Sequence, residues 1–73
     1  MIRAIIVDDE KDARDSIQLI FSQFFTDEVE IVASLSSVKE AVKAINTLKP
    51  ELVFLDIEMP NENGLQLFEY FGD

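Results

Sequence analysis

The chain contains three short apolar runs that are typical of β-strands. Residues 2–7 are apolar except for Arg3, residues 29–33 are rich in β-branched side chains, and residues 52–55 are continuously apolar. The first and third runs do not alternate regularly with polar residues, which favours strands of a parallel sheet that are buried on both faces. We predict three strands at these positions.

Two segments between these runs have the apolar spacing of amphipathic helices. In residues 12–25, apolar side chains recur every three or four positions, and polar side chains fall on the opposite side. The apolar set is Ala13, Ile17, Ile20, Phe21 and Phe24. We predict a helix over this range, with this face in the core.

The second helix has a start signal and a stop signal. Ser37 and Glu40 form a capping-box pattern, in which each side chain satisfies a backbone N–H of the first turn. Lys49 and Pro50 end the helix. Its apolar face, also expected in the core, consists of Val38, Ala41, Val42, Ile45 and Leu48. Turn-forming residues 61–64 then precede the start of a third apolar helical segment within residues 65–71.

The order strand, helix, strand, helix, strand, helix predicts an α/β fold. Right-handed crossovers make the strands of such a series parallel and place the helices on the faces of the sheet. Neither an internal repeat nor a long linker interrupts the series. The sequence therefore predicts a (βα)3 portion of a doubly wound parallel sheet, one small domain or a part of one across residues 1–73.

The composition narrows the possible chemistry to carboxylates. Fifteen acidic residues against six basic ones give a formal net charge of -9, which disfavours direct binding to nucleic acid or to an anionic membrane. Because the chain has no cysteine and no histidine, thiolate zinc sites, disulfides and imidazole catalysis are excluded. No apolar run approaches the roughly 20 residues that a membrane span requires. We therefore expect a cytoplasmic protein.

Both continuous apolar strands end in aspartate. Asp8 and Asp9 follow the first strand, and Asp56 follows the third. Since sites in open parallel sheets form at the carboxyl ends of strands, neighbouring positions for these two strands would bring the three carboxylates together. Their mutual repulsion favours a hard divalent cation with oxygen ligands, most simply Mg²⁺. The backbone carbonyl of Glu58 is a further candidate ligand.

Such a site suits phosphoryl transfer to a carboxylate, with Asp56 as the nucleophile. Each feature by itself has a plainer explanation. Asp8, Asp9 and Glu10 alone are typical of an acidic helix start, and Asp56 alone is typical of a strand end. The functional hypothesis depends on these features occurring together.

The combined pattern resembles the response-regulator receiver family of two-component signalling. The matching stretches are residues 5–10 (IIVDDE), residues 52–60 (LVFLDIEMP) and Gly64. The resemblance implies a flavodoxin-like sheet of strand order 2-1-3, and phosphotransfer to Asp56 from a histidine kinase or a histidine phosphotransfer protein. It also implies Mg²⁺ held by Asp9, Asp56 and the Glu58 carbonyl, with Asp8 assisting. The motif that starts at Asp56 further resembles receivers attached to LytTR-type DNA-binding domains.

The chain departs from the receiver pattern after the third strand. A receiver continues through a fourth and a fifth strand, which supply a Ser or Thr hydroxyl and a Lys that contact the phosphoryl group. Neither role can be assigned to a residue of this chain and no output domain follows, so we expect a partial receiver. The third strand would then form a sheet edge, and exposed edges invite pairing. We therefore expect a homodimer formed through this edge or through the third-helix segment.

Three functional hypotheses follow. The first is a phosphoacceptor module that phosphorylates itself from a phosphodonor with Mg²⁺, which is not the activity of a conventional enzyme. The second is a non-catalytic interaction module that binds or sequesters a kinase or phosphotransfer partner through the first helix, or associates with itself. The third, a metal-dependent phosphatase or hydrolase, is weaker because the chain lacks the additional acid, base and lysine groups of such sites.

Overall fold

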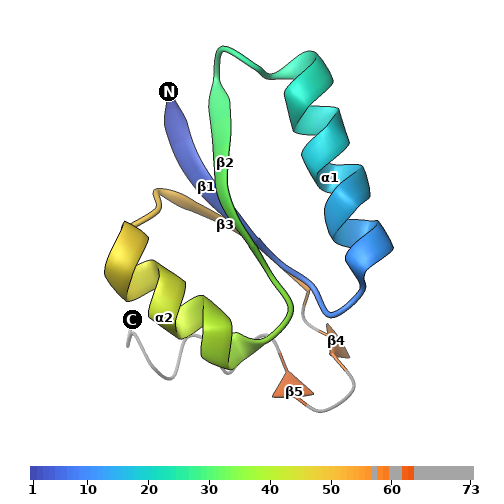
Figure 1. Cartoon of the computed structure of the whole chain (residues 1–73), viewed down its shortest axis with the longest axis vertical. Coiled ribbons are helices and arrows are strands. Elements are labelled where there is room, and N and C mark those ends of the chain that lie inside the picture. Colours follow the sequence, from blue (N-terminus) through green and yellow to red (C-terminus); the bar gives the residue numbers. More distant parts are fainter. Residues whose placement is uncertain (57, 60–61, 64–73) are drawn as a thin grey trace.

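A three-stranded sheet with one helix on each face forms the body of the computed structural model, which describes residues 1–56, 58–59 and 62–63 (Figure 1). The elements of this body are β1 (Ile2–Val7), α1 (Lys11–Phe24), β2 (Val29–Leu35), α2 (Val38–Leu48) and β3 (Leu52–Leu55). Two further strands of two residues each, β4 (Glu58–Met59) and β5 (Glu62–Asn63), pair antiparallel. The predicted α/β series is therefore confirmed through its third strand.

The sequence pattern did not predict the pairing of β4 with β5. Turn chemistry was expected over residues 61–64, whereas Glu62 and Asn63 are paired with Met59 and Glu58. The remaining positions of that turn, Asn61 and Gly64, and the predicted third-helix segment lie outside the described residues.

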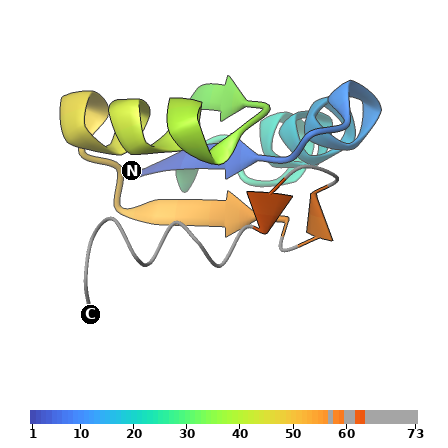
Figure 2. The same ribbon diagram turned by 90° about the horizontal axis from the view of Figure 1, so that it is seen from below.

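The three main strands are parallel in the order β2-β1-β3, as expected. Val7, at the end of β1, pairs with Leu35 of β2 and with Leu55 of β3, so all three strands end at the same edge (Figure 2). The β1–β2 register shifts by one residue at Val32, which forms a bulge. Pairing with β1 continues to Leu35 and carries β2 beyond its predicted end at residue 33.

The central strand provides most of the core. Ala4, Ile5, Ile6 and Val7 are all 0% exposed. Ile5 and Val7 form a cluster with Val38 and Ala41 of α2, and alternation along the strand directs Ala4 and Ile6 toward α1 on the other face. Complete burial of an Ile or Val side chain contributes about 1.5–3 kcal/mol, so β1 fixes the position of both layers.

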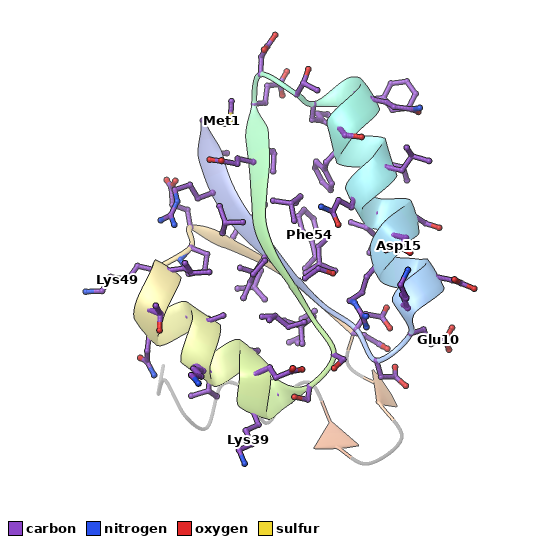
Figure 3. The ribbon with its side chains drawn as sticks, viewed as in Figure 1. Met1, Glu10, Asp15, Lys39, Lys49 and Phe54 are labelled. Atoms are coloured by element: carbon purple, nitrogen blue, oxygen red, sulfur yellow. The ribbon has the colours of Figure 1, made fainter. Side chains whose placement is uncertain are left out.

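Helix α1 matches its predicted range to within one residue but contacts the sheet along a narrower strip than expected. Ala13, Ile17 and Phe21 are half-buried, and the ring centroids of Phe21 and Phe54 lie 4.8 Å apart. Phe54 lies between the sheet and α1 (Figure 3). Ile20 and Phe24 are 48% and 72% exposed, so the prediction that they belong to the core is wrong. A sheet of three strands is wide enough to cover only the centre of the apolar face of α1.

Helix α2 forms over the predicted range, but its expected core face is only partly buried, since Val42, Ile45 and Leu48 are half-buried. The hydroxyl of Ser37 accepts a hydrogen bond from the backbone N–H of Glu40 at 3.1 Å, which is one half of a capping box, and the Glu40 carboxylate accepts the backbone N–H of Ser36 at 3.2 Å. At the other end, Lys49 adopts a left-handed conformation with φ 50°, and the Arg3 guanidinium donates to the carbonyl of Leu48 at 2.6 Å. The buried residues of the helix are Val38, Ala41 and Ala44. Arg3 thereby links the start of β1 to the end of α2.

Strand β3 is less buried than its continuous apolar run predicted. Val53, Phe54 and Leu55 are half-buried and Leu52 is 37% exposed. Within the described residues β3 pairs with β1 alone, which agrees with the expected edge position. Neither helix in this part of the chain combines the length and the apolar character that a membrane crossing requires.

Candidate functional site

Three aspartates meet at the edge where the strands end. Asp8 and Asp9 follow β1, Asp56 follows β3, and all three are half-buried. One carboxylate oxygen from each residue lies within 4.8 Å of the others. The strand order β2-β1-β3 produces this juxtaposition, because it makes β1 and β3 neighbours with a common end.

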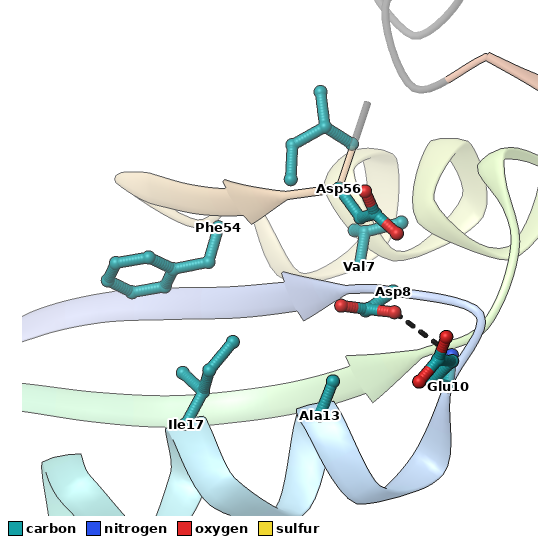
Figure 4. A pocket seen from close by; sticks show the side chains of 8 residues that line it. Val7, Asp8, Glu10, Ala13, Ile17, Phe54 and Asp56 are labelled. Atoms are coloured by element: carbon teal, nitrogen blue, oxygen red, sulfur yellow. Dashed lines mark hydrogen bonds between the residues drawn. The ribbon is translucent and has the colours of Figure 1, made fainter. Parts of the chain in front are cut away.

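Asp56 is anchored to the central strand through its backbone. Its N–H donates a 2.9 Å hydrogen bond to the carbonyl of Val7, which extends the β1–β3 ladder one position past the end of β3. The side chains of Asp56 and Asp8 lie close together at the strand ends (Figure 4). The backbone of Asp56 is therefore held in place by the sheet.

Asp8 is held at three atoms. Its N–H donates to the carbonyl of Leu35 at 3.0 Å, and its carboxylate accepts the N–H of Glu10 at 2.9 Å, drawn as a dashed line in Figure 4. Its carbonyl accepts a 2.8 Å hydrogen bond from Nη1 of Arg14. The side-chain bond to Glu10 also satisfies one of the free N–H groups just before α1. Asp8 thus begins the turn into α1 and also contributes a carboxylate to the acidic cluster.

A cavity of about 410 Å³ opens between the strand ends and α1. Its polar wall includes Asp8, Glu10 and Asp56 (Figure 4). Its other lining residues are Val7, Ala13, Ile17, Phe54 and Leu55. The carboxylates therefore face a space that is open to solvent on one side and bounded by apolar side chains on the other.

The donor set fits a hard divalent cation. Three carboxylates so close together repel one another, and a cation held between their oxygens relieves the repulsion. Mg²⁺ is commonly bound through one or two carboxylates, with water and phosphate oxygens completing an octahedron, and half-buried carboxylates leave room for such ligands. Glu58 is the first residue of β4, and its backbone pairs with that of Asn63. Its carbonyl therefore stays a predicted ligand.

Sequence reasoning missed the contact of Arg14 with the acidic turn. Arg14 is one of the polar residues in 12–25 that were expected opposite the apolar face, yet the residue is half-buried and its guanidinium donates to the Asp8 carbonyl. A cation on the first turns of a helix that follows an acidic pair is a signal that would have suggested this contact.

The charge of Arg14 also affects Glu40, which lies in the first turn of α2. The pKa of Glu40 is lowered, first by the Ser36 hydroxyl, then by other hydrogen bonds, and to a smaller extent by the charge of Arg14.

Comparisons with known proteins agree with the fold. The response regulator receiver domain family matches residues 4–72. The chain is 48% identical over 67 residues to an uncharacterised response regulatory protein of Yersinia pestis, and 39% identical over 67 residues to the transcriptional regulatory protein BtsR of Salmonella typhi. Each match covers 92% of this chain and 27% of the relative.

A solved structure has the same architecture. The response regulator domain of Thermotoga maritima CheB superposes with a TM-score of 0.86 at 31% identity, covering 97% of this chain and 52% of that one. The expected flavodoxin-like arrangement is therefore confirmed for the described part of the chain. The chain spans about a quarter of the length of the curated relatives and about half of the solved domain.

Proposed function

Because the chain belongs to the response regulator receiver family, we propose that it is a phosphoacceptor module of a two-component phosphorelay, with Asp56 as the residue that accepts the phosphoryl group in the presence of Mg²⁺. The observation that carries this proposal is the position of Asp56 at the end of β3, within 4.8 Å of the Asp8 and Asp9 carboxylates. The proposed donor is a phosphohistidine of a kinase or a phosphotransfer protein.

In the proposed step, a carboxylate oxygen of Asp56 forms a bond to phosphorus. The phosphorus–nitrogen bond of the donor breaks, and the imidazole nitrogen leaves with the bonding electrons and then takes up a proton. The hydrogen bond from Asp56 to Val7 keeps the backbone of the nucleophile in place before the donor arrives. Asp9, Asp56 and the Glu58 carbonyl, assisted by Asp8, would hold Mg²⁺. The bound ion would neutralise charge on the phosphoryl oxygens.

Phosphorylation by a small donor tests the proposal. The chain is incubated with acetyl phosphate and Mg²⁺, and its intact mass is measured. We expect the unaltered chain and Asp27→Asn, which removes a surface carboxylate, to gain the mass of one phosphoryl group. Asp56→Asn should gain none. Failure of the unaltered chain to gain mass, or an undiminished gain in Asp56→Asn, would contradict the proposal.

Exposed apolar side chains support a second candidate function, a binding module. Leu19, Ile20 and Phe24 of α1 are 56%, 48% and 72% exposed, and β3 has a single strand partner in the described part of the chain. Ile20 and Phe24 are four positions apart and so share one face of the helix, and neighbouring exposed apolar groups often mark protein contacts. We propose that the α1 face that carries Ile20 and Phe24, or the outer edge of β3, associates with a second copy of the chain, or with a kinase or phosphotransfer partner, without requiring chemistry at Asp56.

Sedimentation separates self-association from the alternatives. We expect a dimeric mass at micromolar concentration. If the α1 face forms the contact, Phe24→Lys should shift the mass toward monomer and Gln23→Lys, which places the same charge at the neighbouring exposed position, should not. If the β3 edge forms the contact, neither variant should shift the mass. Asp56→Asn should sediment as the unaltered chain does. A monomeric mass for the unaltered chain would contradict the homodimer.

A further inference from the structure

Arg14 contacts the peptide that joins the two adjacent aspartates of the site. Its Nη1 donates to the carbonyl oxygen of Asp8 at 2.8 Å, and the residue is half-buried. We infer that Arg14 is a positioning residue: it fixes the orientation of the Asp8–Asp9 peptide and thereby raises the affinity of the acidic cluster for Mg²⁺. This inference rests on the proposed function.

Hydrogen bonds of the sheet hold the Val7–Asp8 peptide, but they do not extend to the next peptide, Asp8–Asp9. The carbonyl of Val7 accepts the N–H of Asp56, and the N–H of Asp8 donates to Leu35, so the Val7–Asp8 peptide is held from both neighbouring strands. β1 ends at Val7. The carbonyl of the next peptide, Asp8–Asp9, lies past the ladder and is held by Arg14. Rotation of this peptide would change the direction in which Asp9 leaves the strand.

Three hydrogen bonds close a ring around the turn. The Asp8 carboxylate accepts the N–H of Glu10, the carbonyl of Glu10 accepts the N–H of Arg14 at 3.1 Å, and the guanidinium of Arg14 returns to the Asp8 carbonyl. Asp9 is the residue between Asp8 and Glu10 in the segment that these bonds span. The first turn of α1 and the acidic pair are thus held as one unit, and Arg14 supplies the only long side chain in the ring.

Charge and positioning predict opposite effects for removal of Arg14. If the guanidinium acted through its charge alone, its loss would leave the three carboxylates with less nearby positive charge, and Mg²⁺ would bind more tightly. If it acts by holding the peptide, its loss would weaken binding. Residues that orient metal ligands typically change metal affinity about 10-fold or more when they are removed. The sign of the change therefore decides between the two roles.

Calorimetric titration with Mg²⁺ measures this sign. We expect Arg14→Gln to bind Mg²⁺ about 10-fold more weakly than the unaltered chain. Arg14→Lys should recover part of the loss, because an ammonium group can donate one hydrogen bond but lacks the planar fork of arginine. Lys11→Gln is the matched control. It removes one positive charge from the first turn of the same helix, where Lys11 forms an exposed ion pair with Asp15. Its affinity should be unchanged or slightly higher.

Two further measurements separate positioning from a general loss of structure. In phosphorylation by acetyl phosphate, Arg14→Gln should need more Mg²⁺ for half-maximal rate and should recover the rate of the unaltered chain at saturating Mg²⁺. In the absence of cation, hydrogen exchange at the Glu10 amide should be faster in Arg14→Gln than in Lys11→Gln. Equal or tighter Mg²⁺ binding by Arg14→Gln would overturn the inference. If the unaltered chain bound no Mg²⁺, the proposed function would fail. The hydrogen-exchange measurement would then still test Arg14, because equal exchange of the Glu10 amide in Arg14→Gln and Lys11→Gln would overturn its positioning role.

Discussion

The backbone N–H of Asp56 donates a 2.9 Å hydrogen bond to the carbonyl of Val7, and this bond connects the two parts of the acidic site. Asp8 follows Val7 directly, so the residue that anchors Asp56 is also the one from which the acidic turn departs. The N–H of Asp8 is bound in turn to Leu35 of β2. All three strands therefore contribute to the position of the carboxylates. A substitution that distorts the sheet should also displace these carboxylates.

Magnesium should stabilise the fold through the acidic cluster. Binding to the folded state alone raises the free energy of unfolding by about 2.7 kcal/mol at a concentration 100 times the dissociation constant. We expect Asp9→Asn to lose most of this gain and, in EDTA, to be at least as stable as the unaltered chain, because one of three repelling carboxylates is gone. Urea unfolding with Mg²⁺ and with EDTA measures both effects. An equal gain from Mg²⁺ in Asp9→Asn would exclude this site, and Asp27→Asn serves as the surface control.

The loss in free energy of unfolding when an isoleucine is replaced by alanine should depend on how deeply that isoleucine is buried. Ile5 is 0% exposed in the centre of the sheet, so Ile5→Ala should lower the free energy of unfolding by about 2–5 kcal/mol. The same truncation at Ile20, which is 48% exposed, should cost less than about 1 kcal/mol. Urea unfolding of the two variants provides the comparison. Similar losses would mean that Ile20 is covered in solution, as association through α1 would produce.

The cap of α2 should contribute measurably to stability. Ser37 accepts the N–H of Glu40, and Ser37→Ala should cost about 1 kcal/mol. Ser22 provides a control, because its exposed hydroxyl donates to the Leu19 carbonyl inside α1 and Ser22→Ala should change stability by no more than about 0.5 kcal/mol. Thermal unfolding followed by circular dichroism tests the pair. A loss in Ser22→Ala as large as that in Ser37→Ala would argue against a specific capping effect.

Glu40 should make a small, pH-dependent contribution to stability. The hydroxyl of Ser36 is the main cause that lowers the pKa of Glu40 below its ordinary value of 4.5. The folded state therefore binds this proton more weakly than the unfolded state does, so the contribution is complete above pH 4.5 and is lost as the pH falls through the lowered pKa. Because the carboxylate is exposed, water screens the effect and keeps it small.

The variant Glu40→Gln should remove the contribution of Glu40 to the pH dependence of the free energy of unfolding. Its free energy of unfolding should fall less steeply than that of the unaltered chain as the pH is lowered below 4.5. Glu30→Gln, at an exposed position of β2, is the control. Urea unfolding at a series of acidic pH values gives the curves. Parallel curves for Glu40→Gln and the unaltered chain would contradict the assigned cause.

Local sequence signals predicted most of the helices and strands, but they did not predict how much of each apolar face is buried. The capping pattern at Ser37 and the stop at Lys49 placed α2 correctly, because both act within one helical turn. Ile20 and Phe24 were placed in the core on the same kind of pattern and are exposed. Periodicity shows which face of a helix is apolar, whereas the width of the neighbouring sheet decides how much of that face is covered.

By itself, the sequence determined the order of the elements and the chemical character of the site: two apolar strands that are each followed by aspartate, in a chain without histidine or cysteine. Only the tertiary structure decided that the three carboxylates meet within 4.8 Å, that Val32 forms a bulge in β2, and that Arg14 contacts the Asp8 carbonyl. The physical reason is the range of the interactions. Turn and helix signals act between residues a few positions apart, whereas strand register and the contacts at strand ends depend on segments that become neighbours only when the sheet forms.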